Sequence, residues 1–371
     1  NEITMQKKIG IITFHNSVNY GAVMQTYGLQ EFLKNNGYNV EIVDYVNDKI
    51  YLELNSTIPI KYSSPKSVLT CIAKRLHRHR KANMFNAFNE RNLNLSQKRN
   101  VRSDEISELS SLYDIVITGS DQVWNLNLTG NDAVYFLNFP DSKTKRVAYA
   151  VSVGDIDNVN LSSFLPEIKM FSNISVREKT LLDLLYSRYN ISTALCSDPT
   201  IMAGKNIFSS ITSDRLIKNK YVFCFLMESK PGIMEVAHKL ADERGWEVID
   251  NKSSFKFFLH SKPEDFLSWI KNSEVVLTDS FHGTVFSVLF GKQFISDKYD
   301  GQKKVKSRVR DLLEILGVVD YFCEISLENY FELEKKISTL INYDSINCKL
   351  EEFSASSQKW LIKAVEGTAN E

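Results

Sequence analysis

The sequence has few cysteines, and their spacing argues against two kinds of stabilising site. They are odd in number and form no Cys-x-x-Cys pair, so neither a disulfide framework nor a zinc site is expected. The first residues, Asn1 to Lys8, lack the basic-then-apolar order of a secretory signal. Together these features predict a cytoplasmic protein that holds no metal. The five cysteines are Cys71, Cys196, Cys224, Cys323 and Cys348.

The chain also lacks an excess of either charge and any long apolar run. Its 45 lysines and arginines are balanced by 45 aspartates and glutamates over 371 residues, which argues against a nucleic-acid partner. No apolar run approaches the ~20 residues needed to span a bilayer. Apolar residues make up 43% and charged residues 24%, as in ordinary globular proteins, and the length favours two domains.

No Gly-x-Gly-x-x-Gly fingerprint is present, yet strand-like and helix-like segments alternate in two series. Such alternation predicts an α/β fold with two Rossmann-like domains that face each other across a cleft. We expect the first domain over 1–203, the second over 214–348, a link over 203–219, and a C-terminal helix within 349–371 that crosses back. The expected strands are 8–14, 39–44, 113–119, 146–151, 174–176, 194–196, 221–227, 246–249, 274–277 and 293–296.

Residues 47–110 interrupt the first series and differ from it in composition. They are rich in lysine, arginine, asparagine and serine, and they include the basic run 74–81, KRLHRHRK. Charge runs are usually the solvated faces of helices, so we expect a helical insertion here. Binding of an anionic partner by the basic run is the alternative.

The most informative stretch is 278–284, TDSFHGT, which lies between two apolar runs. A strand that ends in a polar turn and a helix is how α/β proteins build sites at the carboxyl ends of strands. His282 is therefore expected in the first helical turn, where N–H groups and the helix dipole attract anions. A histidine there is suited to moving a proton. The alternative is a capped helix with a buried histidine.

Three further expected strands end in polar residues. Asp121 could accept a proton from a sugar hydroxyl, and Trp124 could stack on a sugar face. The alternative for this pair is a capped turn with a packed tryptophan. Ser152 follows the strand 146–151, and Arg177 follows 174–176. Arginine matches carboxylate or phosphate with two parallel hydrogen bonds, although an ion pair with Glu178 or another acid would also explain it.

Taken together, these segments resemble the polysaccharide pyruvyl transferase family. The matching pieces occur in family order over roughly 9 to 317. They are Asn19-Tyr20-Gly21 with Gln25, then 119–125 (GSDQVWN), 149–154 (YAVSVG), 175–178 (SVRE), 278–284 and 307–309 (SRV). The resemblance implies a fold similar to the two-domain GT-B glycosyltransferases. It also implies transfer of a pyruvyl group from phosphoenolpyruvate to two hydroxyls of a sugar in a bacterial surface polysaccharide or its precursor, such as a capsule or exopolysaccharide. Phosphate is released, and no further cofactor is required.

The resemblance gives the residues hypothetical roles. His282 is the acid or the proton shuttle at the leaving phosphate, and Asp121 is the base. The first helix start, at Asn19, Tyr20 and Gly21, offers N–H groups to acceptor or donor. Expected donor contacts are Arg177, Ser280, Gly283, Lys304 and Arg308, the last two from the basic stretch 303–310. Expected acceptor or anion contacts are Asn19, Tyr20, Gly21, Ser120, Trp124 and Ser152.

Two other functions remain open at this point. A GT-B glycosyltransferase that uses a nucleotide sugar would suit the layout equally, with Asp250 as the candidate ribose contact. A non-catalytic protein that binds polysaccharide precursors is the second. A lipid-linked oligosaccharide acceptor would make residues 47–100 a membrane-facing patch, and the protein would then contact the inner face of the membrane. The sequence leaves the oligomeric state open.

Overall fold

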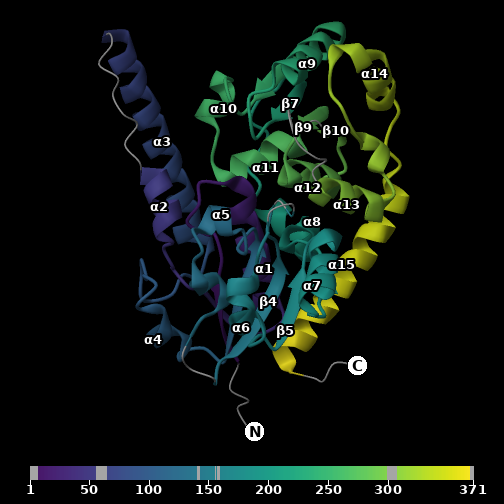
Figure 1. The fold of residues 1–371 in the computed structure, drawn as a ribbon. Coiled ribbons are helices and arrows are strands. Elements are labelled where there is room, and N and C mark those ends of the chain that lie inside the picture. The colour runs from purple at the N-terminus through teal and green to yellow at the C-terminus, as the bar shows by residue number, and fades with distance from the viewer. Residues whose placement is uncertain are drawn as a thin grey trace. The chain divides into compact units, whose positions relative to one another are not determined.

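The computed structural model describes residues 7–55, 65–139, 143–154, 156, 159–298 and 307–367 (Figure 1). The chain divides into two compact units, each described here by itself. The first comprises Asn1–Pro199 and Gln358–Glu371, and the second comprises Thr200–Ser357. Each unit is built on one parallel sheet with helices between the strands. The predicted α/β class with two parallel sheets is therefore confirmed.

The sheet of the first unit has six strands in the order β2-β1-β3-β4-β5-β6. The central strands are continuous apolar runs, as expected for parallel strands that are covered on both faces. In the register, Ile9 lies opposite Val40 of β2 and Ile115 of β3. The strands are β1 (Lys8–Ile12), β2 (Asn39–Ile42), β3 (Ile115–Asp121), β4 (Lys145–Val151), β5 (Asn173–Val176) and β6 (Ala194–Leu195).

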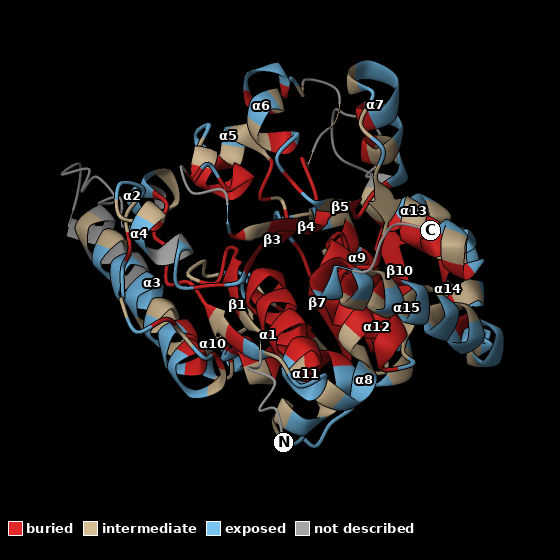
Figure 2. Cartoon of the chain, turned by 90° about the horizontal axis from the view of Figure 1, so that it is seen from below, coloured by how far each residue is buried: buried red, intermediate tan, exposed pale blue. Residues whose placement is uncertain are grey.

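Helix α1 is buried along most of its length, whereas α3 is largely exposed (Figure 2). Gln25 of α1 ties the helix to the sheet, because its Nε2 donates to Thr13 Oγ1 at 2.8 Å and its Oε1 accepts from the Ser120 N–H at 3.1 Å. The other helices of this unit are short. The helices are α1 (Tyr20–Asn35), α2 (Asp48–Asn55), α3 (Pro65–Asn92), α4 (Ile106–Ser110), α5 (Leu126–Thr129), η1 (Ala133–Phe136), η2 (Ser162–Phe164), α6 (Leu165–Ile168) and α7 (Lys179–Tyr189).

The insertion predicted over 47–110 is helical and consists mainly of α2 and α3, which lie beside each other (Figure 1). Aromatic side chains attach α3 to α1: the Tyr20 ring lies 4.9 Å from Phe85, and the Tyr27 ring lies 6.1 Å from Phe88. The basic run lies on α3, and its residues 75–79 are exposed, as expected for a solvated face.

The sheet of the second unit has five strands in the order β11-β10-β9-β7-β8. The sequence did not predict β11, because two residues are too short to form a pattern. The strands are β7 (Tyr221–Phe225), β8 (Glu247–Asp250), β9 (Val275–Thr278), β10 (Gln293–Asp297) and β11 (Phe322–Cys323). The helices are α8 (Pro199–Ile211), α9 (Pro231–Arg244), α10 (Phe255–Leu259), α11 (Pro263–Lys271), α12 (Phe281–Leu289), α13 (Ser307–Leu316), η3 (Val319–Tyr321), η4 (Leu327–Asn329), α14 (Tyr330–Ser338) and α15 (Tyr343–Glu366).

Within the predicted link over 203–219, the residues up to Ile211 form the end of α8. Gly204 has a φ of 78° inside this helix and divides its apolar pattern into two short parts. Neither part is long enough to be recognised as a helix in the sequence. The second part of α8 is anchored by Phe208, whose ring packs edge-on against Phe286 at 5.1 Å. Helix α15 begins in the second unit, and from Gln358 onward it belongs to the first. There Lys7 Nζ donates to the carbonyl of Val365 at 3.1 Å.

Among the described helices, none combines the length and the apolar character that crossing a membrane demands.

Candidate functional site

His282 lies in the first turn of α12, directly after the carboxyl end of β9. Ser280 caps this helix, since its Oγ accepts from the Gly283 N–H at 3.4 Å. Thr278 Oγ1, at the end of β9, accepts from the Ser280 N–H at 3.1 Å and stabilises the turn between β9 and α12. The His282 side chain is largely buried, and its ring packs edge-on against Phe281 at 5.1 Å. Histidine thus stands where the helix dipole favours an anion, as the sequence predicts.

Gly283 lets α12 approach β9 closely. A Cβ at this position would lie 2.4 Å from Thr278 Oγ1 and 3.2 Å from the Phe225 ring, so a side chain would push the helix away. Its N–H already donates to Ser280. The structural contribution of Ser280 and Gly283 is therefore to hold the turn that presents His282. Their roles as donor contacts stay predictions.

Lys230 is a site residue that the sequence analysis missed. It precedes α9, and its Nζ lies 2.8 Å from Asp297 Oδ2 and 3.4 Å from Asp279 Oδ2. Burial by itself lowers the pKa of Lys230, but the hydrogen bond to Asp297 and the charges of both aspartates outweigh burial and raise this pKa. The ammonium is therefore charged at neutral pH, and it joins the ends of β7, β9 and β10. A signal existed in the sequence, because Asp279 and Asp297 each follow an expected strand closely.

Other cations follow the strands of this sheet. Lys252 lies just after β8, and its Nζ donates to the Met227 carbonyl at 2.7 Å. Lys298 follows β10 directly and is exposed. Arg308 lies in the first turn of α13 and is partly exposed. Lys304, which the sequence analysis paired with Arg308, lies outside the described residues.

In the first unit, Arg177 is at the centre of a buried cluster of charges. Its Nη1 lies 2.6 Å from Asp198 Oδ2, its Nη2 lies 3.3 Å from Asp121 Oδ1, and its Nε lies 3.3 Å from Glu178 Oε1. Burial by itself lowers the pKa of Arg177, but the charges of Asp198, Glu178 and Asp121 raise it above its ordinary value.

This cluster disfavours the predicted role of Arg177 as a clamp on the donor. Three carboxylates surround one guanidinium, so the cluster carries an excess of negative charge that would repel a further anion. The alternative, an ion pair with Glu178 or another acid, describes what is found. Arg177 instead holds Asp121, the last residue of β3 and the candidate base, in one orientation.

Ser120 and Ser152 have no exposed surface. The Oγ of Ser120 donates to the Ala150 carbonyl at 2.7 Å, and the Oγ of Ser152 accepts from the Gly154 N–H at 3.1 Å. The Ser152 N–H also donates to the Asp121 carbonyl at 3.0 Å. These hydrogen bonds shape the ends of β3 and β4, so in this structure both serines support Asp121.

The prediction that Trp124 stacks on a sugar is wrong. Its side chain is 0% exposed, and its ring stacks on Phe136 at 5.2 Å. Its Nε1 donates to the Tyr135 carbonyl at 3.1 Å. A ring that is covered on all sides cannot present a face to a ligand. The packed tryptophan that the sequence analysis kept as an alternative is what the structure contains.

The start of α1 differs from its predicted use. Asn19 is the N-cap, and its Oδ1 accepts from the N–H groups of Gly21 at 2.9 Å and Ala22 at 3.3 Å. Those two N–H groups are therefore occupied by the cap and are not offered to a ligand. Tyr20 is buried and packs on Phe85 of α3. Of these residues, Asn19 is the exposed one.

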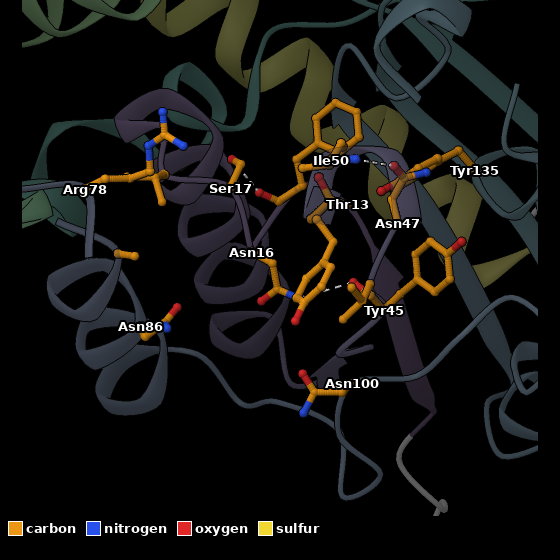
Figure 3. Close-up of a pocket in the computed structure, with 15 residues that line it drawn as sticks. Thr13, Asn16, Ser17, Tyr45, Asn47, Ile50, Arg78, Asn86, Asn100 and Tyr135 are labelled. Atoms are coloured by element: carbon orange, nitrogen blue, oxygen red, sulfur yellow. Dashed lines mark hydrogen bonds between the residues drawn. The ribbon is translucent and has the colours of Figure 1, made fainter. Parts of the chain in front are cut away.

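A pocket with a volume of about 230 Å³ lies in the first unit between α3 and the segments that follow β1 and β2 (Figure 3). The pocket cannot be recognised in the sequence, since its walls come from separate segments. We call it the insertion pocket. It is lined by Thr13, Phe14, Asn16, Ser17, Val18, Tyr45, Val46, Asn47, Ile50, Tyr51, Arg78, Ala82, Asn86, Asn100 and Tyr135.

Comparison with known proteins gives a family and a fold. The family model described as Polysaccharide pyruvyl transferase matches residues 19–300. No curated protein matches the chain. The structure is similar to that of S. aureus MnaA with UDP, with a TM-score of 0.51 and 14% identity over 97% of this chain and 96% of the other. It is also similar to UDP-N-acetylglucosamine 2-epimerase from Rickettsia bellii, with a TM-score of 0.51 and 10% identity over 98% and 96% of the two chains. At such low identity these similarities show the GT-B-like fold alone.

Proposed function

The chain belongs to the polysaccharide pyruvyl transferase family, and from that premise we propose that it transfers a pyruvyl group from phosphoenolpyruvate to two hydroxyls of a sugar. The first hydroxyl adds to C2 of phosphoenolpyruvate while C3 takes a proton and becomes a methyl group. The second hydroxyl then attacks C2 and displaces phosphate. Each hydroxyl loses one proton, and the products are a cyclic pyruvate ketal and inorganic phosphate.

The observation that carries this proposal is the position of His282 in the first turn of α12, after the carboxyl end of β9. Lys252 and Lys298 follow the strands β8 and β10 of the same sheet. The donor bears a phosphate and a carboxylate, which a helix N-terminus and charged lysine or arginine side chains can hold. In this role His282 gives a proton to C3 or to the leaving phosphate. Lys252, Lys298 and Arg308 are cations of this unit's strand ends and α13 that can meet the donor. Lys230, which lies between Asp279 and Asp297, orders these strand ends instead.

Asp121 is the proposed base for the first sugar hydroxyl. Its carboxylate is nearly buried, and one oxygen accepts from Arg177. A base held in one orientation loses less conformational freedom when it takes a proton from a bound hydroxyl. Arg177, Ser120 and Ser152 are positioning residues in this account, since their contacts act on Asp121 or on the strand ends beside it.

The described residues do not favour a nucleotide-sugar glycosyltransferase. The candidate ribose contact, Asp250, is occupied: its Oδ1 accepts from the N–H groups of Lys252 at 2.8 Å and Ser253 at 2.6 Å, and its Oδ2 accepts from the Ser253 hydroxyl at 2.8 Å. Asp250 thus closes the turn after β8.

A thermal-shift titration tests the donor class. We expect phosphoenolpyruvate to stabilise the full chain by about 2.7 kcal/mol at 100 times its dissociation constant, and UDP to give no shift. The Lys298→Gln variant should show a smaller shift, because it lacks one exposed cation at the end of β10. Lys271→Gln, which removes an exposed lysine at the end of α11, is the matched control and should respond like the wild type. A shift with UDP and none with phosphoenolpyruvate would overturn the proposed function.

We also propose that the insertion contacts the membrane that carries a lipid-linked acceptor. Ile72 and Leu76 are four residues apart on α3, so they share one face, and both are exposed. Tyr51 and Leu52 of α2 are exposed as well, and Arg75 lies beside Leu76. Apolar side chains among basic ones favour an anionic lipid surface.

Vesicle pelleting checks this contact. The full chain should pellet with vesicles that contain phosphatidylglycerol, and less so as salt is raised. The substitution Leu76→Asp should reduce pelleting, whereas Leu112→Asp, at an exposed leucine outside the insertion helices, should not. Equal pelleting of the two variants would argue against contact through α3.

A further inference from the structure

The walls of the insertion pocket are mainly uncharged and polar, so they carry little positive charge for binding an anion. Four asparagine side chains and three tyrosine rings line it, and Arg78 is the one charged residue among its lining residues. Arg78, Ala82 and Asn86 follow one another at intervals of four along α3, so they form one row facing the pocket. Figure 3 shows Arg78 and Asn86 on one side and Tyr45, Asn47 and Tyr135 on the other.

The floor of the pocket is held in place by a buried carboxylate. Asp44 Oδ1 accepts from Asn16 Nδ2 at 3.2 Å, and Asp44 Oδ2 accepts from the Asn100 N–H at 3.0 Å. His15 Nε2 and Arg99 Nε contact the same carboxylate at 2.9 Å and 2.8 Å. Burial by itself raises the pKa of Asp44, but His15 and Arg99 outweigh burial and lower it. Two lining asparagines are thus attached to one carboxylate that stays charged.

A second carboxylate fixes the opposite wall. Asp132 Oδ2 accepts from the Tyr45 hydroxyl at 2.5 Å and from Asn47 Nδ2 at 2.6 Å. Asn47 Nδ2 also donates to the Thr129 carbonyl at 2.9 Å, while its Oδ1 accepts from the Ile50 N–H at 2.9 Å. A pocket whose side chains are already ordered spends less conformational entropy when it binds a ligand.

From these observations we infer that the insertion pocket binds an uncharged sugar ring, and that Arg78 contacts a phosphate attached to that ring. The side-chain amides of Asn86 and Asn100 and the Oδ1 of Asn16 can exchange hydrogen bonds with the hydroxyls of a sugar. The rings of Tyr45 and Tyr51 can cover its apolar C–H surface. A single arginine suits one phosphate group. Phosphoenolpyruvate, with two anionic groups, finds too little positive charge here.

The ligand class is therefore a glycosyl phosphate, which is the end at which a lipid-linked sugar is joined to its carrier. Its identification as the acceptor rests on the proposed function; the binding of a sugar does not. Because the pocket is built by α2, α3 and the segments after β1 and β2, it gives the insertion a role in choosing the acceptor.

Binding of simple sugars to the full chain tests the inference. The probes are the methyl glycosides and the 1-phosphates of glucose, galactose, mannose and N-acetylglucosamine. Their binding is measured by saturation-transfer NMR and calorimetry. At least one sugar should bind the wild type, and its 1-phosphate should bind more tightly than its methyl glycoside. Asn86→Ala should weaken both by about tenfold, the effect of one lost hydrogen bond. Arg78→Gln should weaken the 1-phosphate until it binds like the methyl glycoside.

The control is Asn83→Ala, an exposed asparagine on α3 outside the row that faces the pocket, which should bind like the wild type. The inference is overturned if no sugar binds, or if Asn86→Ala and Asn83→Ala bind equally well. Failure here is distinct from failure of the proposed function. Stabilisation by phosphoenolpyruvate without sugar binding would refute only the inference that the insertion pocket binds a sugar. Sugar binding without any response to phosphoenolpyruvate would refute only the proposal that phosphoenolpyruvate is the donor.

Discussion

Replacing His282 with alanine is expected to lower kcat by about 10²- to 10⁴-fold, the usual effect of losing a general acid or base. The fold should survive, because the Ser280 cap and the close approach at Gly283 do not depend on the imidazole. The measurement is the rate of phosphate release from phosphoenolpyruvate, with the most tightly bound glycoside as acceptor. The His282→Gln variant should be as slow as His282→Ala, since an amide can hydrogen-bond but cannot transfer the proton.

The matched control is His238→Ala, which removes an exposed histidine of α9 in the same unit and should keep the wild-type rate. A His282→Ala variant that turns over at the wild-type rate would remove this residue from the mechanism. If His282→Ala raised KM for phosphoenolpyruvate and left kcat unchanged, His282 would be a binding residue and not the acid.

Replacing Arg177 with methionine is expected to have the largest effect on stability, about 3 to 5 kcal/mol in the free energy of unfolding. The substitution leaves Asp121, Glu178 and Asp198 buried around an uncharged side chain. Such a loss reflects uncompensated buried charge, not the net value of the ion pairs. Urea unfolding at neutral pH measures it. Arg188→Met, at an exposed arginine of α7, is the control and should change the same quantity by less than about 1 kcal/mol.

The pH dependence of this loss has a defined sign. The pKa of Arg177 is raised in the folded protein, so its stabilising contribution is complete below its ordinary value and is lost only at strongly alkaline pH. The deficit of the Arg177→Met variant should therefore be complete at neutral and moderately alkaline pH. A variant that unfolds at the wild-type urea concentration would show that the cluster is not needed for stability.

The sequence predicted the framework because parallel strands are continuous apolar runs that can be recognised one by one. The ten expected strands correspond to β1 through β10. The turn that carries His282 was recognised from the polar residues between two apolar runs. The helix α8 was missed because Gly204 divides its pattern, and β11 because it has only two residues.

The sequence was less informative about which way a side chain points and what it meets. Trp124 and Asp121 are three residues apart, yet one is packed in the core and the other reaches the strand end. Arg177 has the chemistry of an anion clamp, and the carboxylates of Asp121 and Asp198, which come from other segments, change what it can do. The insertion pocket likewise depends on tertiary contacts between segments that have no motif in common.

The most direct test of the account is to identify the product. The full chain is incubated with phosphoenolpyruvate labelled with ¹³C at C2 and the best glycoside, and the sugar is analysed by mass spectrometry and NMR. The account predicts a sugar whose mass has risen by pyruvic acid less one water, with the labelled carbon as a ketal and one phosphate released per product. Phosphate release without a labelled sugar, or glycosyl transfer from a UDP-sugar in place of the ketal, would contradict it.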